Sequence, residues 1–122
     1  MPQLTIYQKP TCSTCRDVMR HIKDAGIDYD AIDYIIEPPS REKLAQILRK
    51  MRVPARDLLR TKEREYLELG LDNPDLTDDQ ILDAIAAHPI LLQRPILVYG
   101  RHAALARPAD RVAEVLRKWK IE

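Results

Sequence analysis

A short β-prone segment near the start of the chain is followed by a turn and then directly by a helix. Residues Leu4–Tyr7 alternate as in a strand, Pro10 interrupts the pattern, and a helical pattern begins at Ser13. Gly26 is placed to end this helix as a C′ glycine, and Ile27–Tyr34 is typical of a second strand. The apolar face of the helix consists of Val18, Met19 and Ile22. This order predicts parallel pairing of the two strands.

The middle of the chain is predicted to be helical. Ser40 caps a segment with one apolar face, and a short helical stretch, Arg56–Leu59, follows Pro54. Thr77 and Gln80 have the spacing of a capping box for a further helix. The apolar residues on these two longer helices are Leu44, Ile47, Leu48 and Met51, and then Ile81, Leu82 and Ile85.

The last part of the chain has the pattern of a hairpin followed by a helix. Pro95–Tyr99 is a buried strand, Gly100 with Arg101 forms the turn, and His102–Ala106 is the returning strand. Pro108 is expected in the first turn of a final helix. The apolar face of that helix is Val112, Val115, Leu116 and Trp119.

Without its central helices, the chain has the order β-α-β followed by β-β-α, which is the thioredoxin-like arrangement. We therefore predict an α/β fold with a mixed four-stranded sheet and an inserted helical subdomain. The 122 residues fit a single domain, 1–122, with a core of about 1–37 and 92–122 and an insertion of about 38–91.

Composition excludes several classes of protein. A net charge of +1 argues against bulk attraction to nucleic acid or membrane, and no apolar run approaches the ~18 residues of a membrane span. The N-terminal residues lack the pattern of a signal peptide, so we expect a cytoplasmic protein.

The two cysteines, Cys12 and Cys15, are three residues apart. This spacing closes too short a loop to stabilise a fold, and two thiols are too few for structural zinc, so no metal is expected and redox chemistry remains. Cys12 precedes the first helix, where unpaired N–H groups and the helix dipole lower thiol pKa values to roughly 3.5–7.5. Arg16, one turn further on, would add positive charge. Cys15 is either part of the apolar face or a resolving thiol.

Four segments of the chain resemble the glutathione- and glutaredoxin-dependent arsenate reductases. They are Tyr7–Arg16, Leu58–Lys62 with the following Tyr66–Leu71, His88–Ile96, and Leu105–Pro108. The resemblance extends from Leu4 to about Leu116, and four motifs in order are specific where each alone is weak.

The resemblance implies a site and a reaction. Arginines at positions 60, 94 and 107 would bind an oxyanion beside Cys12, since forked guanidinium groups match tetrahedral anions, and Pro95 would be a cis proline facing the cysteine. The reaction would convert arsenate to arsenite through a Cys12 adduct. Glutathione would be the co-substrate, glutaredoxin or thioredoxin the partner, and no cofactor would be tightly bound. The three arginines are Arg60, Arg94 and Arg107.

The chain departs from the family pattern at three positions. Typical members have histidine at Gln8, asparagine at Lys9 and a residue other than cysteine at Cys15, which leaves the reductant open. One alternative is a redox-sensing regulator of the Spx type, which shares the fold and the Cys-x-x-Cys and binds the RNA polymerase α C-terminal domain. Another is a thiol reductase of the same fold with a different substrate.

Overall fold

The computed structural model describes residues 4–121, which divide into two compact units. The first unit runs to Glu37 and resumes at Arg94, and the second is Pro38–Gln93. The first contains the sheet and the two cysteines, and the second is helical.

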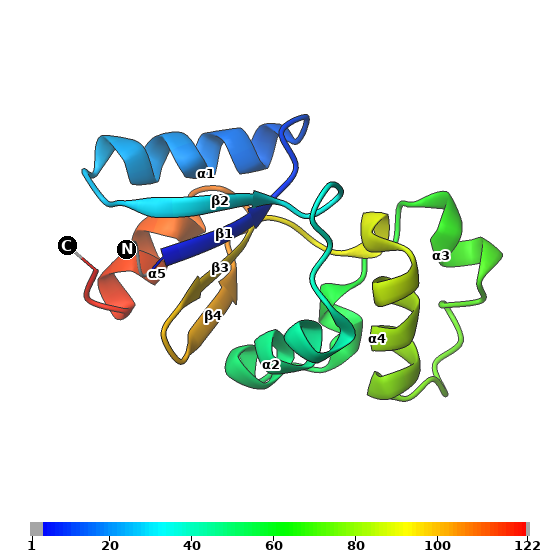
Figure 1. The fold of residues 1–122 in the computed structure, drawn as a ribbon. Helices are drawn as coiled ribbons and strands as arrows, with labels where there is room; N and C mark the ends of the chain where they lie inside the picture. The colour runs from blue at the N-terminus through cyan, green and yellow to red at the C-terminus, as the bar shows by residue number, and fades with distance from the viewer. Residues whose placement is uncertain (1–3, 122) are drawn as a thin grey trace. The chain divides into compact units, whose positions relative to one another are not determined.

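Four strands form one mixed sheet in the first unit. They are β1 (Leu4–Gln8), β2 (Tyr29–Asp33), β3 (Ile96–Tyr99) and β4 (His102–Leu105), arranged in the order β2-β1-β3-β4 (Figure 1). Strand β1 pairs parallel with β2 and antiparallel with β3, and β3 pairs antiparallel with β4. The predicted thioredoxin-like mixed sheet is therefore confirmed.

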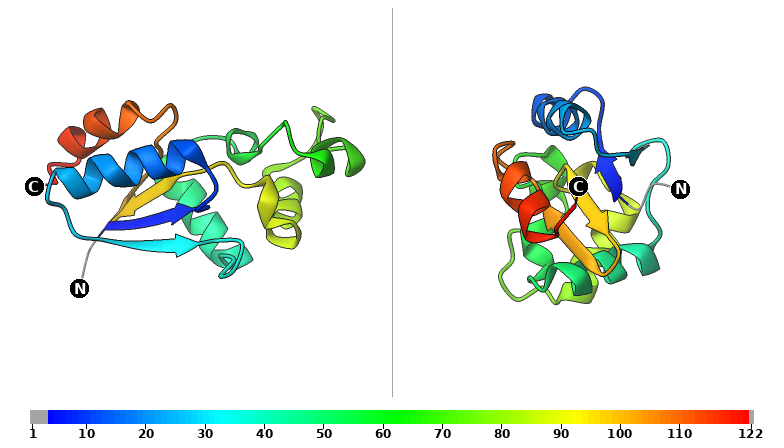
Figure 2. Two further views of the ribbon diagram at one scale, coloured as in Figure 1. Left: turned by 90° about the horizontal axis from the view of Figure 1, so that it is seen from above. Right: turned by 90° about the vertical axis from the view of Figure 1, so that its left-hand side faces the viewer.

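Two helices, α1 (Ser13–Asp24) and α5 (Arg111–Lys118), pack against each other on the same face of this sheet (Figure 2). Both present an apolar face to it, as their spacing predicts. The buried cluster that joins helices and sheet comprises Leu4, Ile6, Val18, Ile22, Ile27, Leu97, Ala106, Val112, Val115 and Leu116. Burial of this cluster fixes the position of α1 and hence of the residue that precedes it.

The end of α1 explains why β2 is shorter than predicted. Gly26 has a φ of 75°, Gly26 N donates to Lys23 O, and Ile27 N donates to Ile22 O. These two bonds make a Schellman motif, so Gly26 is the predicted C′ glycine. Ile27 belongs to the helix cap rather than to the strand, and the prediction of a strand from Ile27 to Tyr34 was wrong at both ends.

The predicted place of Pro108 was also wrong. Helix α5 begins at Arg111, and Pro108 lies in the turn before it. In that turn Arg111 N donates to Pro108 O and Val112 N donates to Ala109 O. Each bond spans three residues rather than four, so the turn is tighter than an α-helix.

The second unit contains three α-helices and two short 3₁₀ helices among its described residues. These are α2 (Arg41–Met51), η1 (Ala55–Leu58), α3 (Arg64–Glu68), α4 (Asp78–Ala87) and η2 (Pro89–Leu91). The predicted Ser40 cap and the Thr77–Gln80 capping box are both confirmed. Helix α2 packs on α4, and Arg41 bridges them by ion pairs of 2.8 Å to Asp79 and Asp83. Helix α3 was not predicted.

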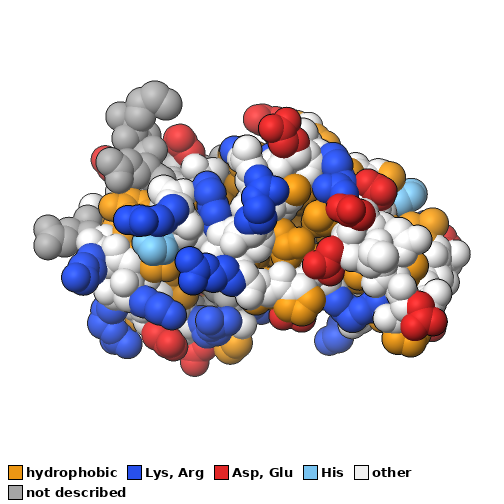
Figure 3. All heavy atoms as spheres, turned by 90° about the horizontal axis from the view of Figure 1, so that it is seen from below, with side chains coloured by type: hydrophobic (Ala, Val, Ile, Leu, Met, Phe, Trp, Pro, Cys, Tyr) orange, Lys and Arg blue, Asp and Glu red, His pale blue; other side chains and the backbone are white. Residues whose placement is uncertain are grey.

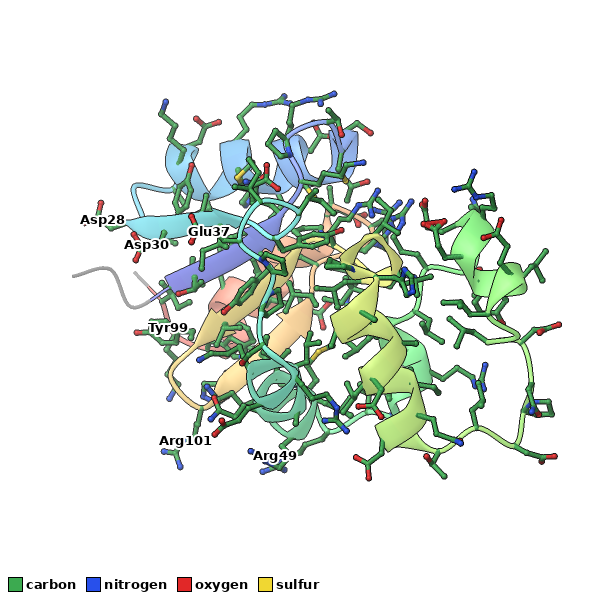
Figure 4. All side chains as sticks on the ribbon, turned by 45° about the vertical axis from the view of Figure 1, so that its right-hand side comes forward. Asp28, Asp30, Glu37, Arg49, Tyr99 and Arg101 are labelled. Atoms are coloured by element: carbon green, nitrogen blue, oxygen red, sulfur yellow. The ribbon has the colours of Figure 1, made fainter. Side chains whose placement is uncertain are left out.

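The surface carries charges of both signs, consistent with a net charge of +1 (Figure 3). Asp28 and Asp30 lie at the edge of the sheet, before and on β2 (Figure 4). Charged side chains on an edge strand oppose pairing with another chain. Within residues 4–121, every helix is too short or too polar to span a lipid bilayer.

Candidate active site

Cys12 is the N-cap of α1, between the end of β1 and the first helical turn. Its backbone is extended, and its Sγ accepts a hydrogen bond from Cys15 N at 3.3 Å. The Cys12 N–H donates to Lys9 O at 2.9 Å, which closes the loop after β1 into a turn. The thiol therefore occupies the place where a serine or aspartate oxygen would usually cap the helix. It is half-buried and within reach of solvent.

The pKa of the Cys12 thiol is lowered from its ordinary value to about 7. Burial by itself raises the pKa, but four hydrogen-bonding groups outweigh burial. These are the Cys15 thiol and backbone N–H and the guanidinium groups of Arg94 and Arg107. Each stabilises the thiolate more than the thiol. A large fraction of Cys12 is consequently the nucleophilic thiolate at neutral pH.

Cys15 has the opposite electrostatic environment. It is completely buried on the sheet side of α1. Burial, and to a smaller extent the nearby Cys12 sulfur, raise the pKa of the Cys15 thiol to about 12. Cys15 is therefore a protonated hydrogen-bond donor to Cys12 at neutral pH, because a thiol this far below its pKa keeps its proton.

Arg94 and Arg107 lie at the open end of the β3–β4 hairpin. Arg94 stands two residues before β3, and Arg107 stands two residues after β4. Ile96 pairs with Leu105, and Ala106 N donates to Pro95 O, so the same register brings Arg94 opposite Arg107. Tyr99 and Arg101 mark the turn end of the hairpin (Figure 4). The peptide bonds Arg94–Pro95 and Arg107–Pro108 are both cis.

The Arg107 side chain connects the hairpin to the thiol. Its Nη1 lies 4.0 Å from Cys12 Sγ and 3.1 Å from the Arg94 carbonyl oxygen, to which it donates. Arg94 itself is buried, with 6% of its surface exposed, and its Nη1 donates to the Tyr34 hydroxyl at 2.9 Å. Two guanidinium groups are thus held next to one sulfur, an arrangement that can bind an anion at the point of nucleophilic attack.

Tyr34 was not predicted as a site residue. It follows β2, is completely buried, and donates its backbone N–H to Gln8 O at 3.3 Å. In the sequence it is one aromatic residue at the end of a strand, which is also what a core residue looks like. No local signal separates the two roles.

The loop before Cys12 contains the remaining candidates of the first unit. The Arg16 guanidinium is exposed and donates to Pro10 O at 2.9 Å. Arg16 therefore braces this loop, and its effect on the charge at Cys12 stays a prediction. Gln8 is buried with 6% of its surface exposed, and among the described residues its Oε1 has no hydrogen-bond partner.

Arg60 belongs to the helical unit. It follows η1, where the segment ending at Arg60 pairs with the segment after η2: Leu59 bridges Leu92, and Arg60 N donates to Leu91 O at 2.7 Å. The Arg60 Nε donates to Glu63 at 3.1 Å. Its predicted role at the oxyanion stays a prediction.

A thioredoxin-like sheet with a low-pKa thiol at a helix N-terminus defines the class of thioredoxin-like proteins with a reactive cysteine. The two arginines beside the thiol distinguish this chain within that class. The chain matches the ArsC family over residues 7–115, and it belongs to that family.

Named relatives agree with this assignment. The chain is 40% identical over 116 residues to an arsenate reductase of Escherichia coli, covering 95% of this chain and 82% of that one. It is 39% identical to an arsenate reductase of Neisseria meningitidis, covering 95% of this chain and the whole of that one. The solved structure of an arsenate reductase from Vibrio cholerae matches with a TM-score of 0.87 and 35% identity, covering 93% of this chain and 97% of that chain.

Proposed function

We propose that this protein reduces arsenate to arsenite through a covalent adduct on Cys12, with glutathione and glutaredoxin as electron donors. The single observation that carries the proposal is the Cys12 thiol, with a pKa of about 7, next to Arg94 and Arg107. A thiolate beside two guanidinium groups suits attack on an anion that would otherwise repel it. The names of the relatives support arsenate as that anion.

In the proposed reaction the Cys12 thiolate attacks arsenic, and a protonated arsenate oxygen leaves as water. Arg94 and Arg107 hold the remaining oxygens and stabilise the charge that develops on them. Glutathione then attacks the Cys12 sulfur, the S–As electron pair passes to arsenic, and arsenite leaves. Arsenic gains two electrons, and the two thiols give them up by forming a mixed disulfide. A glutaredoxin thiol reduces that disulfide and regenerates Cys12.

The environment of Cys15 supports an external thiol at the second step. A resolving thiol must reach the Cys12 sulfur as a thiolate. Cys15 is completely buried, and its raised pKa of about 12 keeps it protonated at neutral pH. Cys15 is therefore proposed to stabilise the Cys12 thiolate rather than to resolve its adduct.

Arg60 is proposed as a third arginine for the anion. Its Nε is engaged by Glu63, while a guanidinium carries further N–H groups on its two Nη atoms. Its assignment rests on its position within the Leu58–Lys62 motif.

The test is reduction of arsenate by the purified protein with glutathione and glutaredoxin. We expect arsenite from the wild type and from Cys15→Ala, and none from Cys12→Ser. Equal arsenite production by wild type and Cys12→Ser would refute the proposal. Replacing glutathione and glutaredoxin by thioredoxin tests the donor: full activity with thioredoxin alone would overturn the assignment of glutathione while leaving arsenate reduction in place.

A further inference from the structure

Tyr34 is the residue that joins the end of β1 to Arg94. Its backbone N–H donates to Gln8 O, four residues before Cys12, and its hydroxyl accepts from Arg94 Nη1 at 2.9 Å. The tyrosine ring is completely buried, so the hydroxyl has a fixed position. A guanidinium bound to a rigid acceptor loses the freedom to turn about its long side chain.

The arginines form a relay from Tyr34 to the sulfur. Tyr34 holds the Arg94 side chain, the Arg94 carbonyl accepts from Arg107 Nη1 at 3.1 Å, and the same Nη1 lies 4.0 Å from Cys12 Sγ. The Arg94 guanidinium is thus tied at one edge, which leaves its remaining N–H groups at defined angles. Bidentate binding of an oxyanion depends on such angles more than on charge alone.

We propose that Tyr34 is a positioning residue for the anion site: its hydroxyl sets the orientation of the Arg94 guanidinium for a tetrahedral oxyanion bound at Cys12. The inference rests on the proposed function for the identity of the anion as substrate. It adds a residue that acts through Arg94 and touches neither substrate nor sulfur.

The hydroxyl can be removed with little change in shape by Tyr34→Phe. Tyr29→Phe is the matched control, because Tyr29 lies on β2, is half-buried and packs against the same sheet core. Both variants lose one phenolic oxygen, and only Tyr34→Phe loses the partner of Arg94. Thermal unfolding of each variant reports whether the fold has changed.

The measurement is protection of Cys12 from iodoacetamide by inorganic phosphate, a tetrahedral anion that accepts no electrons. Loss of one charge-assisted hydrogen bond that orients Arg94 should raise the half-protecting phosphate concentration about tenfold in Tyr34→Phe. The KM for arsenate should rise by a similar factor while kcat stays within about twofold, as expected for lost anion binding before the chemical step. Tyr29→Phe should match the wild type in both.

Two further variants make the proposal falsifiable if Tyr34→Phe folds poorly. Arg94→Lys keeps the charge but lacks the planar fork, and it should lose phosphate protection about as much as Tyr34→Phe. Wild-type protection in Arg94→Lys would overturn the claim that orientation matters. In an Arg94→Ala background, Tyr34→Phe should have no additional effect, because its route to the anion is gone. An equal effect in both backgrounds would overturn the assignment.

Failure of the inference differs from failure of the proposed function. If phosphate and arsenate leave the alkylation rate of the wild type unchanged, the anion site itself is refuted. If the wild type is protected and Tyr34→Phe is protected equally, only the role of Tyr34 is refuted.

Discussion

Replacing Arg107 by alanine removes a positive charge that lies 4.0 Å from the Cys12 sulfur. Two unit charges at that distance interact by about 1 kcal/mol in water and about 4 kcal/mol at an effective dielectric constant of about 20. Cys12 is half-buried and reaches solvent, so the lower part of this range applies. A loss of roughly 1–2 kcal/mol corresponds to a rise of roughly one unit in the thiol pKa.

The expected change is therefore from a pKa of about 7 in the wild type to roughly 8 in Arg107→Ala. A lowered thiol pKa favours the thiolate at neutral pH, so raising it removes thiolate. At pH 7 the thiolate fraction should fall from about one half to about one tenth, and the alkylation rate about fivefold. Above about pH 9.5 the thiolate predominates in both proteins, and the two rates should converge.

The assay is the pH dependence of the iodoacetamide reaction, followed by mass spectrometry of intact protein. Arg107→Lys should lie between wild type and alanine, because it keeps the charge but loses the fork. Arg20→Ala is the control on α1, since Arg20 is exposed and paired with Asp17 at 2.6 Å. An unchanged profile in Arg107→Ala would refute the electrostatic argument, as would an equal shift in Arg20→Ala.

The remaining predictions concern the second cysteine and the helical unit. Cys15→Ala should raise the pKa of Cys12, because the Cys15 thiol donates to the Cys12 sulfur, while Cys15→Ser keeps a donor and should shift it less. Titration of the alkylation rate measures both, and a lower pKa in Cys15→Ala would contradict this. Thr77→Ala removes the capping box at α4, in which Gln80 N donates to Thr77 Oγ1 at 3.2 Å. It should lower the free energy of unfolding by about 1 kcal/mol in urea titration; Thr61→Ala, at an exposed loop position, is the control, and equal midpoints would exclude a role for the cap.

Much of the fold could be predicted because its signals are local. The Ser40 cap, the Thr77–Gln80 box and the C′ glycine Gly26 are each specified by residues within one helical turn. Helix α3 could not be predicted in the same way. It is five residues long, none of them is buried, and Glu63 at its N-cap makes no side-chain capping bond. Such a helix has neither an apolar stripe nor a cap to mark it.

The site was predictable in its residues but not in its causes. The helix N-terminus at Cys12 pointed to a lowered pKa, and the value of about 7 lies in the range expected from the sequence. The sequence could not show that the Cys15 thiol is a donor to Cys12, because a Cys-x-x-Cys pattern does not reveal which sulfur is buried. The bond from Arg94 to Tyr34 spans 60 residues, and contacts at that separation depend on the sheet order rather than on any local pattern.

The hairpin register has a consequence for how a protein of this kind can change length. Arg94 and Arg107 are opposite each other because thirteen positions separate them through β3, the Gly100 turn and β4. A single residue added at the Gly100 turn would either bulge outward or slip the pairing by one position, and a slip would turn one arginine to the opposite face of the sheet. Insertions in the loops of the helical unit leave this spacing untouched. Surviving length variants should therefore carry their insertions between Pro38 and Gln93, and the hairpin should act as a ruler whose length cannot drift.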